Sequence, residues 1–183
     1  MKVQIIPGFE ALKIITANID NTDQYRINEL FSNYRAQHPT SNTSNLNCWH
    51  SHYNTHEIDP RFNQINRILT HMLEDIDYNV NSYSMTYKVQ DMWFAQYEKG
   101  DSASKHHHYG SDWSCVYYID VEENASPLMF SSGISIKPEN GLVVFFNSCL
   151  SHEVPPTNGK RSCLAVNFIK EGIFDGSIRI SIR

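Results

Sequence analysis

Two kinds of hydrophobic pattern divide the chain near residue 82. Before it, apolar residues recur every three or four positions in places, which is typical of helices with one buried face. After it, short runs rich in β-branched and aromatic residues are separated by Gly, Pro, Asn and Asp, which is typical of strands joined by turns. The pattern predicts a mainly β protein with flanking helices on one outer face of its sheets.

The first part of the chain contains two predicted helices. The clearer one covers 62–76, where seven apolar residues form a single stripe: Phe62, Ile65, Ile68, Leu69, Met72, Leu73 and Ile76. A weaker pattern predicts a helix from Asp23 to Arg35. The polar segment 38–54 between them is predicted to be a loop.

The second part of the chain contains six or seven predicted strands, which favours a β-sandwich or jelly roll. A length of 183 residues suits one domain with a substantial core, so we expect a single domain over 1–183. Within it, 1–90 supply the helical flank and supporting strands, 91–170 the jelly-roll core, and 171–183 a C-terminal strand.

Composition and charge restrict the partners. Hydrophobic residues make up 40% and charged residues 19%, with a net charge of −5 and no run of five Lys or Arg. We therefore expect no nucleic-acid partner and no anionic membrane surface. Apolar runs are too short for a membrane span, and the N-terminus lacks the pattern of a signal peptide. The four cysteines form no CxxC pair, which favours free thiols in a cytoplasmic protein.

Three consecutive histidines, 106–108, precede a predicted strand. In an extended segment His106 and His108 point the same way, about 6.5 Å apart at roughly 3.3 Å per residue, and His107 points the other way. His152 follows the most apolar strand and could complete a metal site with that pair. A polar loop with adjacent histidines explains the HxH pattern about equally well by itself.

A predicted strand beginning at Arg161 has one face that is poorly suited to a core. Arg161, Cys163, Ala165 and Asn167 share one face of this strand, and the alternating residues on the other face are mostly apolar. Such a face would make a good wall for a pocket that holds an anion, because arginine presents a planar fork to a carboxylate. The alternative is a surface arginine at the start of a strand.

The order of these motifs resembles that of the Fe(II)/2-oxoglutarate oxygenases, in the branch close to prolyl hydroxylases. The matching stretches are "YEKG" at 97–100, "HHH" at 106–108, "VYYI" at 116–119 and "HEVPPTNGKR" at 152–161. A phage- and bacteria-associated branch with an HxH motif is similar over about Trp93 to Phe168. The resemblance implies a double-stranded β-helix, a jelly roll of the cupin type.

The resemblance also implies roles for individual residues. His106 and His152 match the two iron-binding histidines, and Arg161 matches the arginine that binds the far carboxylate of 2-oxoglutarate. Tyr117 matches a strand tyrosine that hydrogen-bonds the same carboxylate, and Tyr97 matches one near the chelating end. Asn167 matches a pocket-facing position. The implied cofactors are Fe(II), 2-oxoglutarate and O₂, and the implied reaction is hydroxylation with release of succinate.

One position departs from the family pattern: His108 stands where the usual iron-binding carboxylate is expected. It is either a third ligand or a neighbour of a site completed by water, and Asp112 or Glu153 are alternative sources of a carboxylate. Two competing hypotheses are a cofactor-independent three-histidine dioxygenase of the cupin type and a non-catalytic jelly-roll metal-binding module.

The sequence does not identify the substrate, which we expect to be a small molecule or a peptide. Trp93, Tyr109 and Trp113 are candidates for the rim of the pocket, although packing roles explain each of them as well. A homodimer is compatible with the sequence.

Overall fold

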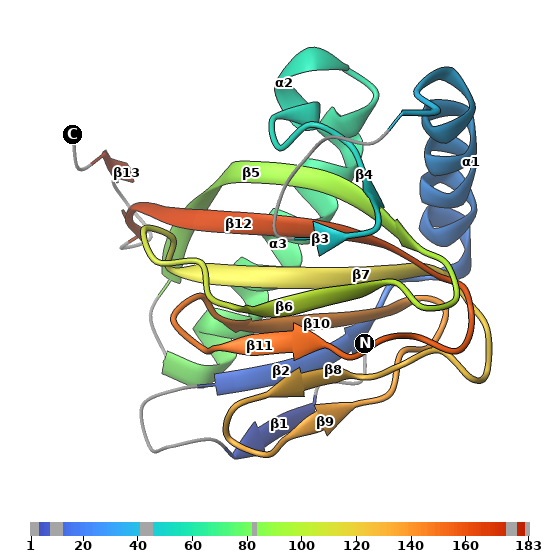
Figure 1. Ribbon diagram of the computed structural model, residues 1–183. Coiled ribbons are helices and arrows are strands. Elements are labelled where there is room, and N and C mark those ends of the chain that lie inside the picture. The colour runs from blue at the N-terminus through green and yellow to red at the C-terminus, as the bar shows by residue number, and fades with distance from the viewer. Residues whose placement is uncertain (1–3, 8–12, 41–45, 82–83, 175–178, 182–183) are drawn as a thin grey trace.

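The structure is a computed structural model that describes residues 4–7, 13–40, 46–81, 84–174 and 179–181. The described residues form two antiparallel sheets that face each other, with a long helix behind the larger sheet (Figure 1). This is the mainly β jelly-roll architecture with flanking helices that the hydrophobic pattern predicts.

The larger sheet has eight described strands, in the order β1-β2-β10-β7-β12-β5-β4, with β13 paired to β12. Their bounds are β1 Gln4–Pro7, β2 Lys13–Asn18, β10 Leu142–Asn147, β7 Trp113–Val121, β12 Arg161–Phe174, β5 Ser84–Tyr97, β4 Trp49–His50 and β13 Arg179–Ser181. The long strands β5 and β12 pair along almost their whole length, so they form the most extensive strand pair of the sheet.

The smaller sheet has five described strands, in the order β3-β6-β11-β8-β9. Their bounds are β3 Leu46–Asn47, β6 Ser102–His106, β11 His152–Val154, β8 Leu128–Phe130 and β9 Ser135–Ile136. In Figure 1 these strands lie in front of the larger sheet. The space between the two sheets is therefore lined by the front face of the larger sheet and the back of the smaller one.

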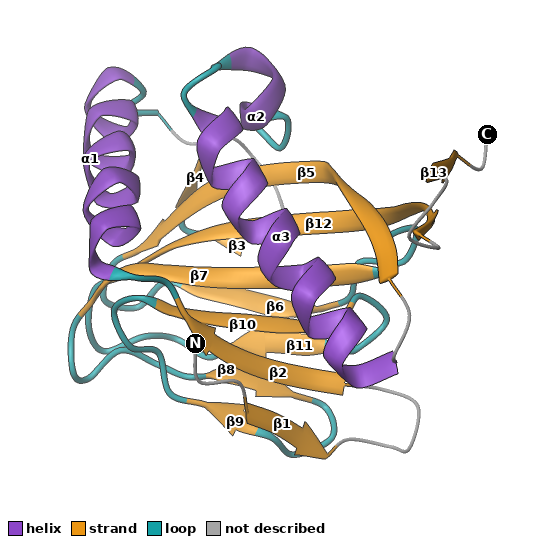
Figure 2. Cartoon of the chain, turned by 180° about the vertical axis from the view of Figure 1, so that it is seen from behind, coloured by secondary structure: helices purple, strands orange, loops and turns teal. Residues whose placement is uncertain are grey.

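Two of the helices pack on the outer face of the larger sheet, and a short one lies above its β5 edge (Figure 2). They are α1 Asn21–Gln37, α2 Thr55–Ile58 and α3 Phe62–Asn81. In α3 all seven residues of the predicted apolar stripe belong to, or pack against, the core between helices and sheet. The predicted helix over 62–76 is therefore confirmed and extends five residues further, and the helix predicted over Asp23 to Arg35 is confirmed as α1.

The segment 38–54 is only partly a loop. It contains β3, which pairs with β6 in the smaller sheet, and β4, which pairs with β5 in the larger one. Two-residue strands carry too little alternation to be seen in a sequence, and their long-range partners define them. The prediction of a continuous loop was wrong at these strands, and 41–45 lie outside the described residues.

Two apolar clusters follow from this layering. One lies between the helices and the outer face of the larger sheet, and the other lies between the two sheets. All four cysteines are free thiols, as predicted. Among the described residues, no helix has the length and hydrophobicity needed to cross a membrane.

Candidate metal centre

The three predicted histidines meet between the two sheets. His106 is the last residue of β6, His152 is the first of β11, and the two are paired in register. His108 follows two residues after β6 and completes the group. One ring nitrogen from each residue lies within 4.8 Å of those of the other two. The convergence predicted from the HxH spacing and the distant third histidine is therefore present.

Two of the imidazoles are oriented by their own backbones. The Nδ1–H of His106 donates to the carbonyl of Ser104 at 2.7 Å, and that of His152 donates to the carbonyl of Leu150 at 2.9 Å. A proton held on Nδ1 leaves the lone pair of Nε2 available as a metal ligand. Both rings are thus prepared to bind through the same type of nitrogen.

Burial keeps these histidines neutral. It lowers the pKa of His152 to about 3 and that of His108 to about 4, and the neighbouring His106 ring adds to both effects. The pKa of His106 is also lowered, mainly by burial. Neutral imidazole is the form that binds transition metals, so the group is ready for a metal at neutral pH.

Neither alternative carboxylate joins the histidines. Asp112 accepts a hydrogen bond from the backbone N–H of Lys170 at 2.8 Å, which ties it to β12. Glu153 follows His152 in β11 and so points to the opposite face of that strand. Within the described residues the cluster consists of three histidines alone. His107 is exposed and stacks on Tyr109 with ring centres 3.7 Å apart, outside the cluster as predicted.

A buried polar network lies beside His108. The Nδ2 of Asn167 is 3.5 Å from Nδ1 of His108 and donates to Oδ2 of Asp91 at 3.1 Å. The Oδ1 of Asn167 accepts from the hydroxyl of Ser114, which also contacts that of Ser148. Asn167 faces the pocket as predicted, and any contact with a cofactor stays a prediction.

Arg161 lies at the other end of the same interior face and is almost completely buried, with 1% exposure. Its Nη2 donates to the hydroxyl of Tyr118 at 3.1 Å. Its Nε and Nη1 have no hydrogen-bond partner in the described part of the chain. The rings of Tyr97 and Tyr118 flank the guanidinium, with centres 5.2 and 5.1 Å from its carbon. A buried cation with unused donors is a strong indication of an anionic ligand.

The expectation that Tyr117 and Arg161 bind the same carboxylate needs correction. Tyr117 pairs with Leu164 and lies in the core under the helices, on the outer face of the larger sheet. Tyr118 pairs with Cys163 and points inward, so it takes the place beside Arg161. Successive strand residues face opposite sides, so a choice between neighbouring tyrosines depends on the register with β12.

Tyr97 also lies at a different end of the pocket from the one expected. It pairs with Arg161 in the sheet, and its ring lies against the guanidinium. Burial raises the pKa of its phenol, so the hydroxyl stays protonated. Tyr97 therefore flanks the arginine end, where its ring and that of Tyr118 enclose the cation.

A narrow interior cavity connects the histidines with Arg161. Its lining includes all three histidines, Asn167 and Arg161. Its volume of about 40 Å³ is space for roughly three water molecules at about 10–15 Å³ each. A five-carbon dicarboxylate fits there only if the lining side chains move apart.

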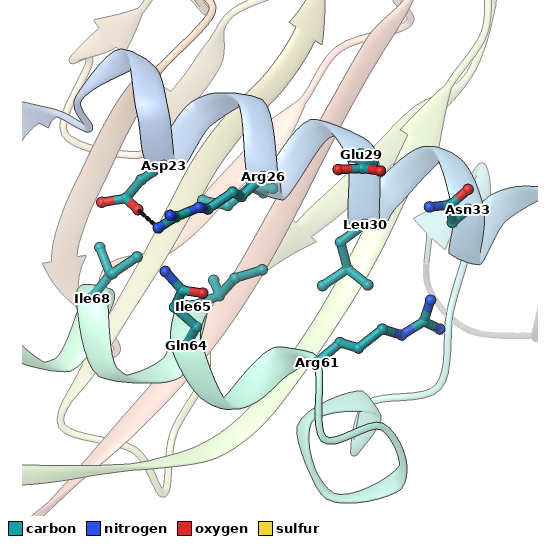
Figure 3. Close-up of a pocket in the computed structure, with 10 residues that line it drawn as sticks. Asp23, Arg26, Glu29, Leu30, Asn33, Arg61, Gln64, Ile65 and Ile68 are labelled. Carbon is teal, nitrogen blue, oxygen red and sulfur yellow. Dashed lines mark hydrogen bonds and ion pairs between the residues drawn. The ribbon is translucent and has the colours of Figure 1, made fainter.

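Another cavity, of about 290 Å³, lies between α1 and α3 (Figure 3). Isoleucines and leucine form part of its lining, and Arg26, Glu29 and Arg61 lie around them; Arg26 forms an ion pair with Asp23. This cavity lies on the helix side of the larger sheet, so it is separate from the histidine cluster.

Comparisons with solved structures identify the fold. A prolyl-4-hydroxylase from Pseudomonas putida matches with a TM-score of 0.65 and 17% identity, over 87% of this chain and 93% of that one. A prolyl hydroxylase from Trichoplax adhaerens, in complex with a hypoxia-inducible-factor peptide, matches with a TM-score of 0.69 and 14% identity, over 89% and 85%. The α-ketoglutarate-dependent epimerase SnoN of nogalamycin biosynthesis matches with a TM-score of 0.65 and 10% identity, over 93% and 88%.

No protein-family model and no curated protein matches the chain. At the low identities of the structural matches, the likeness establishes architecture and leaves the chemistry to the residues of the site. The chain has the jelly-roll fold shared by these three enzymes, with its histidine cluster between the two sheets.

Proposed function

We propose that the protein is an Fe(II)- and 2-oxoglutarate-dependent oxygenase that hydroxylates a substrate not identified by the sequence. One observation carries the proposal: a buried arginine with two unused donor groups shares a cavity with three converging neutral histidines. The first feature suits a carboxylate and the second suits a transition metal.

The arginine end of the cavity would bind the co-substrate. Removing a guanidinium from water is costly unless its donors are satisfied, and Tyr118 satisfies only one of them here. A carboxylate can accept two parallel hydrogen bonds from the planar fork. Arg161 would therefore hold the far carboxylate of 2-oxoglutarate, with the hydroxyl of Tyr118 beside it.

The histidine end of the cavity would bind the metal. His106, His108 and His152 would hold Fe(II) through neutral nitrogens and leave positions open on the metal. Three neutral imidazoles bring no negative charge to balance the charge of Fe(II), so an anionic co-substrate would supply that negative charge. When bound, iron uses 2-oxoglutarate, O₂ and a C–H bond to give succinate, CO₂ and a C–OH group.

Aromatic side chains shield the His152 side of this site from water. Phe146 packs edge-on against His152 with ring centres 4.8 Å apart, and Phe130 lies 5.9 Å from the same ring. A dry environment strengthens the attraction between Arg161 and a carboxylate, because charges interact more strongly at low dielectric constant. The same residues also protect a reactive centre from side reactions.

A cofactor-independent dioxygenase of the cupin type is the second candidate. The lack of a carboxylate among the clustered ligands in the described residues favours it. It gives no role to Arg161, however, and a non-catalytic metal-binding module gives none either. The unused donors of Arg161 therefore favour the 2-oxoglutarate-dependent enzyme.

The test is a titration of 2-oxoglutarate into the anaerobic Fe(II) protein. Chelation should produce a weak visible charge-transfer band that saturates with the co-substrate. Losing one partner of a buried charge pair costs about 2–5 kcal/mol, so Arg161→Ala should weaken 2-oxoglutarate binding about thirtyfold or more. Iron affinity, measured separately, should change little.

Lys160→Ala is the matched control, because it removes a neighbouring cation that pairs on the surface with Asp120. It should leave the titration unchanged. An iron-loaded protein that shows neither the band nor calorimetric binding of 2-oxoglutarate would contradict the proposal and favour the second candidate.

A further inference from the structure

A wider cavity opens outward from the metal centre. Its volume is about 360 Å³, and its lining includes His106, His108 and Asn167, which also line the interior cavity. Its other walls come from Asp91 and Trp93 of β5, from Tyr53 just before α2, and from Leu46 of β3 and the exposed His107. A substrate in this cavity would therefore reach the metal from the side opposite to Arg161.

One wall of this outer cavity carries a carboxylate without a charged partner. Asp91 in β5 pairs with Asn167 of β12 in the sheet and accepts one hydrogen bond from it, on Oδ2. No Lys or Arg forms an ion pair with Asp91 in the part of the chain that the structure describes, and Asn167 gives its carboxylate the one side-chain hydrogen bond there. The nearby His56 interacts with Asp91 electrostatically, but burial lowers the pKa of His56 and so favours its neutral form. Asn167 is itself held by Ser114, so the amide that donates to the carboxylate is oriented.

The position of Asp91 differs from that of a metal ligand. The donor atoms that lie within 4.8 Å of one another belong to the three histidines, and no oxygen of Asp91 is among them. The carboxylate and His108 instead touch the same Nδ2 atom of Asn167. Asp91 therefore lies near the metal centre but beyond its ligands.

The same cavity has an aromatic wall. Trp93 lies two residues after Asp91 in β5, on the same face, and its ring centre is 5.9 Å from that of His108. Tyr53 packs against Trp93 in a T-shaped contact at 4.9 Å and remains 39% exposed. Aromatic faces beside an unpaired carboxylate form a favourable environment for an organic cation with an apolar stem.

We propose that the outer cavity selects a substrate that carries a protonated amine or a guanidinium group. Asp91 binds the charged nitrogen, Trp93 and Tyr53 enclose the alkyl stem, and a carbon of that stem lies at the histidines. A neutral substrate would leave the carboxylate without compensation, and an anion would be repelled. This inference rests on the proposed function and adds the class of substrate.

Binding can be measured without turnover, by calorimetry on the anaerobic Fe(II) protein with and without 2-oxoglutarate. The probes are N-acetyl-L-lysine methylamide, N-acetyl-L-arginine methylamide, free L-lysine and the neutral N-acetyl-L-norleucine methylamide. At least one cationic probe should bind about tenfold or more tightly than the norleucine compound. Asp91→Asn keeps the shape and the contact with Asn167, and it should remove that preference.

The controls separate charge from folding. Asp120→Asn, an exposed change of the same kind on β7, should retain the preference. Tyr53→Leu removes part of the aromatic wall at an exposed position and should weaken binding of the cationic probe several-fold. Circular dichroism of each variant confirms that the fold is intact.

The outcomes are distinct. Tight binding of the capped compounds alone indicates a side chain within a protein, and tight binding of free lysine indicates a small amine; either supports the proposal. Equal binding of all probes, binding of none, or a preference that survives Asp91→Asn overturns it. Loss of iron from Asp91→Asn also overturns it, because Asp91 would then be a ligand. Selective binding without a 2-oxoglutarate band contradicts only the proposed function.

Discussion

The two faces of the larger sheet differ sharply, although the same strands form both. On the outer face, Leu164, Val166 and Phe168 of β12 are fully buried under the helices, in a core made of apolar side chains. On the inner face, Arg161 and Asn167 of the same strand line the cavity that contains the histidines. Along β12, residues that pack in the apolar core therefore alternate with residues that line the cavity.

This difference shows why such a fold can carry a polar site without losing its core. The outer face buries an amphipathic helix against a continuous apolar surface, which provides stability independent of the cavity. The inner face can then include a cation, an amide and a hydroxyl. Substitutions on the two faces should therefore affect different properties.

The largest expected effect is the loss of folding stability when a residue of the outer-face core is truncated. Leu69 of α3 is completely buried there, and Leu69→Ala should lower the free energy of unfolding by about 2–5 kcal/mol. Chemical denaturation measures this change. Arg67→Ala, an exposed change on the same helix, should have little effect. A large loss of metal affinity in folded Leu69→Ala would show that the two faces are coupled.

The next largest effect is the loss of metal affinity when a histidine of the cluster is removed. Removing a single outer-shell partner of a metal site costs about 10–100-fold in affinity, so removing the ligand in His152→Ala should cost about a hundredfold or more. Competition with a metal indicator measures it. His107→Ala should leave the affinity nearly unchanged, because His107 lies outside the cluster. Equal losses in both variants would contradict the three-histidine site.

In the metal-free protein, the free energy of unfolding should depend on pH, with a smaller change per pH unit than the effects above. In the unfolded chain the two histidines titrate near 6.5, whereas burial lowers the pKa of His152 to about 3 and that of His108 to about 4. Between these values the unfolded chain binds more protons, so stability falls as the pH is lowered from 6.5. The limit is about 1.4 kcal/mol per pH unit for each histidine.

Denaturation of the chelator-treated protein at pH 7, 6 and 5 measures this loss. His152→Asn should show a flatter dependence, because it removes the group with the lower pKa. A stability that does not change between pH 6.5 and 4.5 would mean that the histidines are more solvated than the structure indicates.

The smallest effect compares the neighbouring tyrosines of β7 directly. Tyr118→Phe removes the hydroxyl that accepts from Arg161, and a hydrogen bond of this kind contributes about 0.5–1.5 kcal/mol. Binding of 2-oxoglutarate should therefore weaken roughly two- to tenfold. Tyr117→Phe should leave it unchanged, because that ring lies under the helices. The reverse result would support the assignment made from the sequence.

Local periodicity made several features of the protein predictable from the sequence. The stripe in 62–76 predicted α3, and the alternation after Arg161 correctly placed Asn167 on the cavity face. The HxH spacing and the third histidine predicted a cluster that the structure contains. The helix, the inward position of Asn167 and the shared direction of His106 and His108 depend only on a period of 3.6 or 2, which neighbouring residues set. The place of His152 in the cluster does not follow from a local period.

Features that depend on pairing between distant residues required the tertiary structure. Alternation alone does not choose Tyr118 over Tyr117, because the choice follows from the register of β7 with β12. A clue was available: Tyr118 shares its strand face with the polar Ser114. Without a register, that clue could not be connected to Arg161.

The outer cavity was the feature least accessible to sequence analysis. Asp91 lies next to Asn167 only because β5 and β12 pair over their length, and Tyr53 reaches Trp93 from a segment predicted to be a loop. The sequence by itself therefore determined which residues of a strand share a face. Tertiary structure decided which face points inward and which side chains meet, because a one-residue change of register exchanges the two faces of a strand.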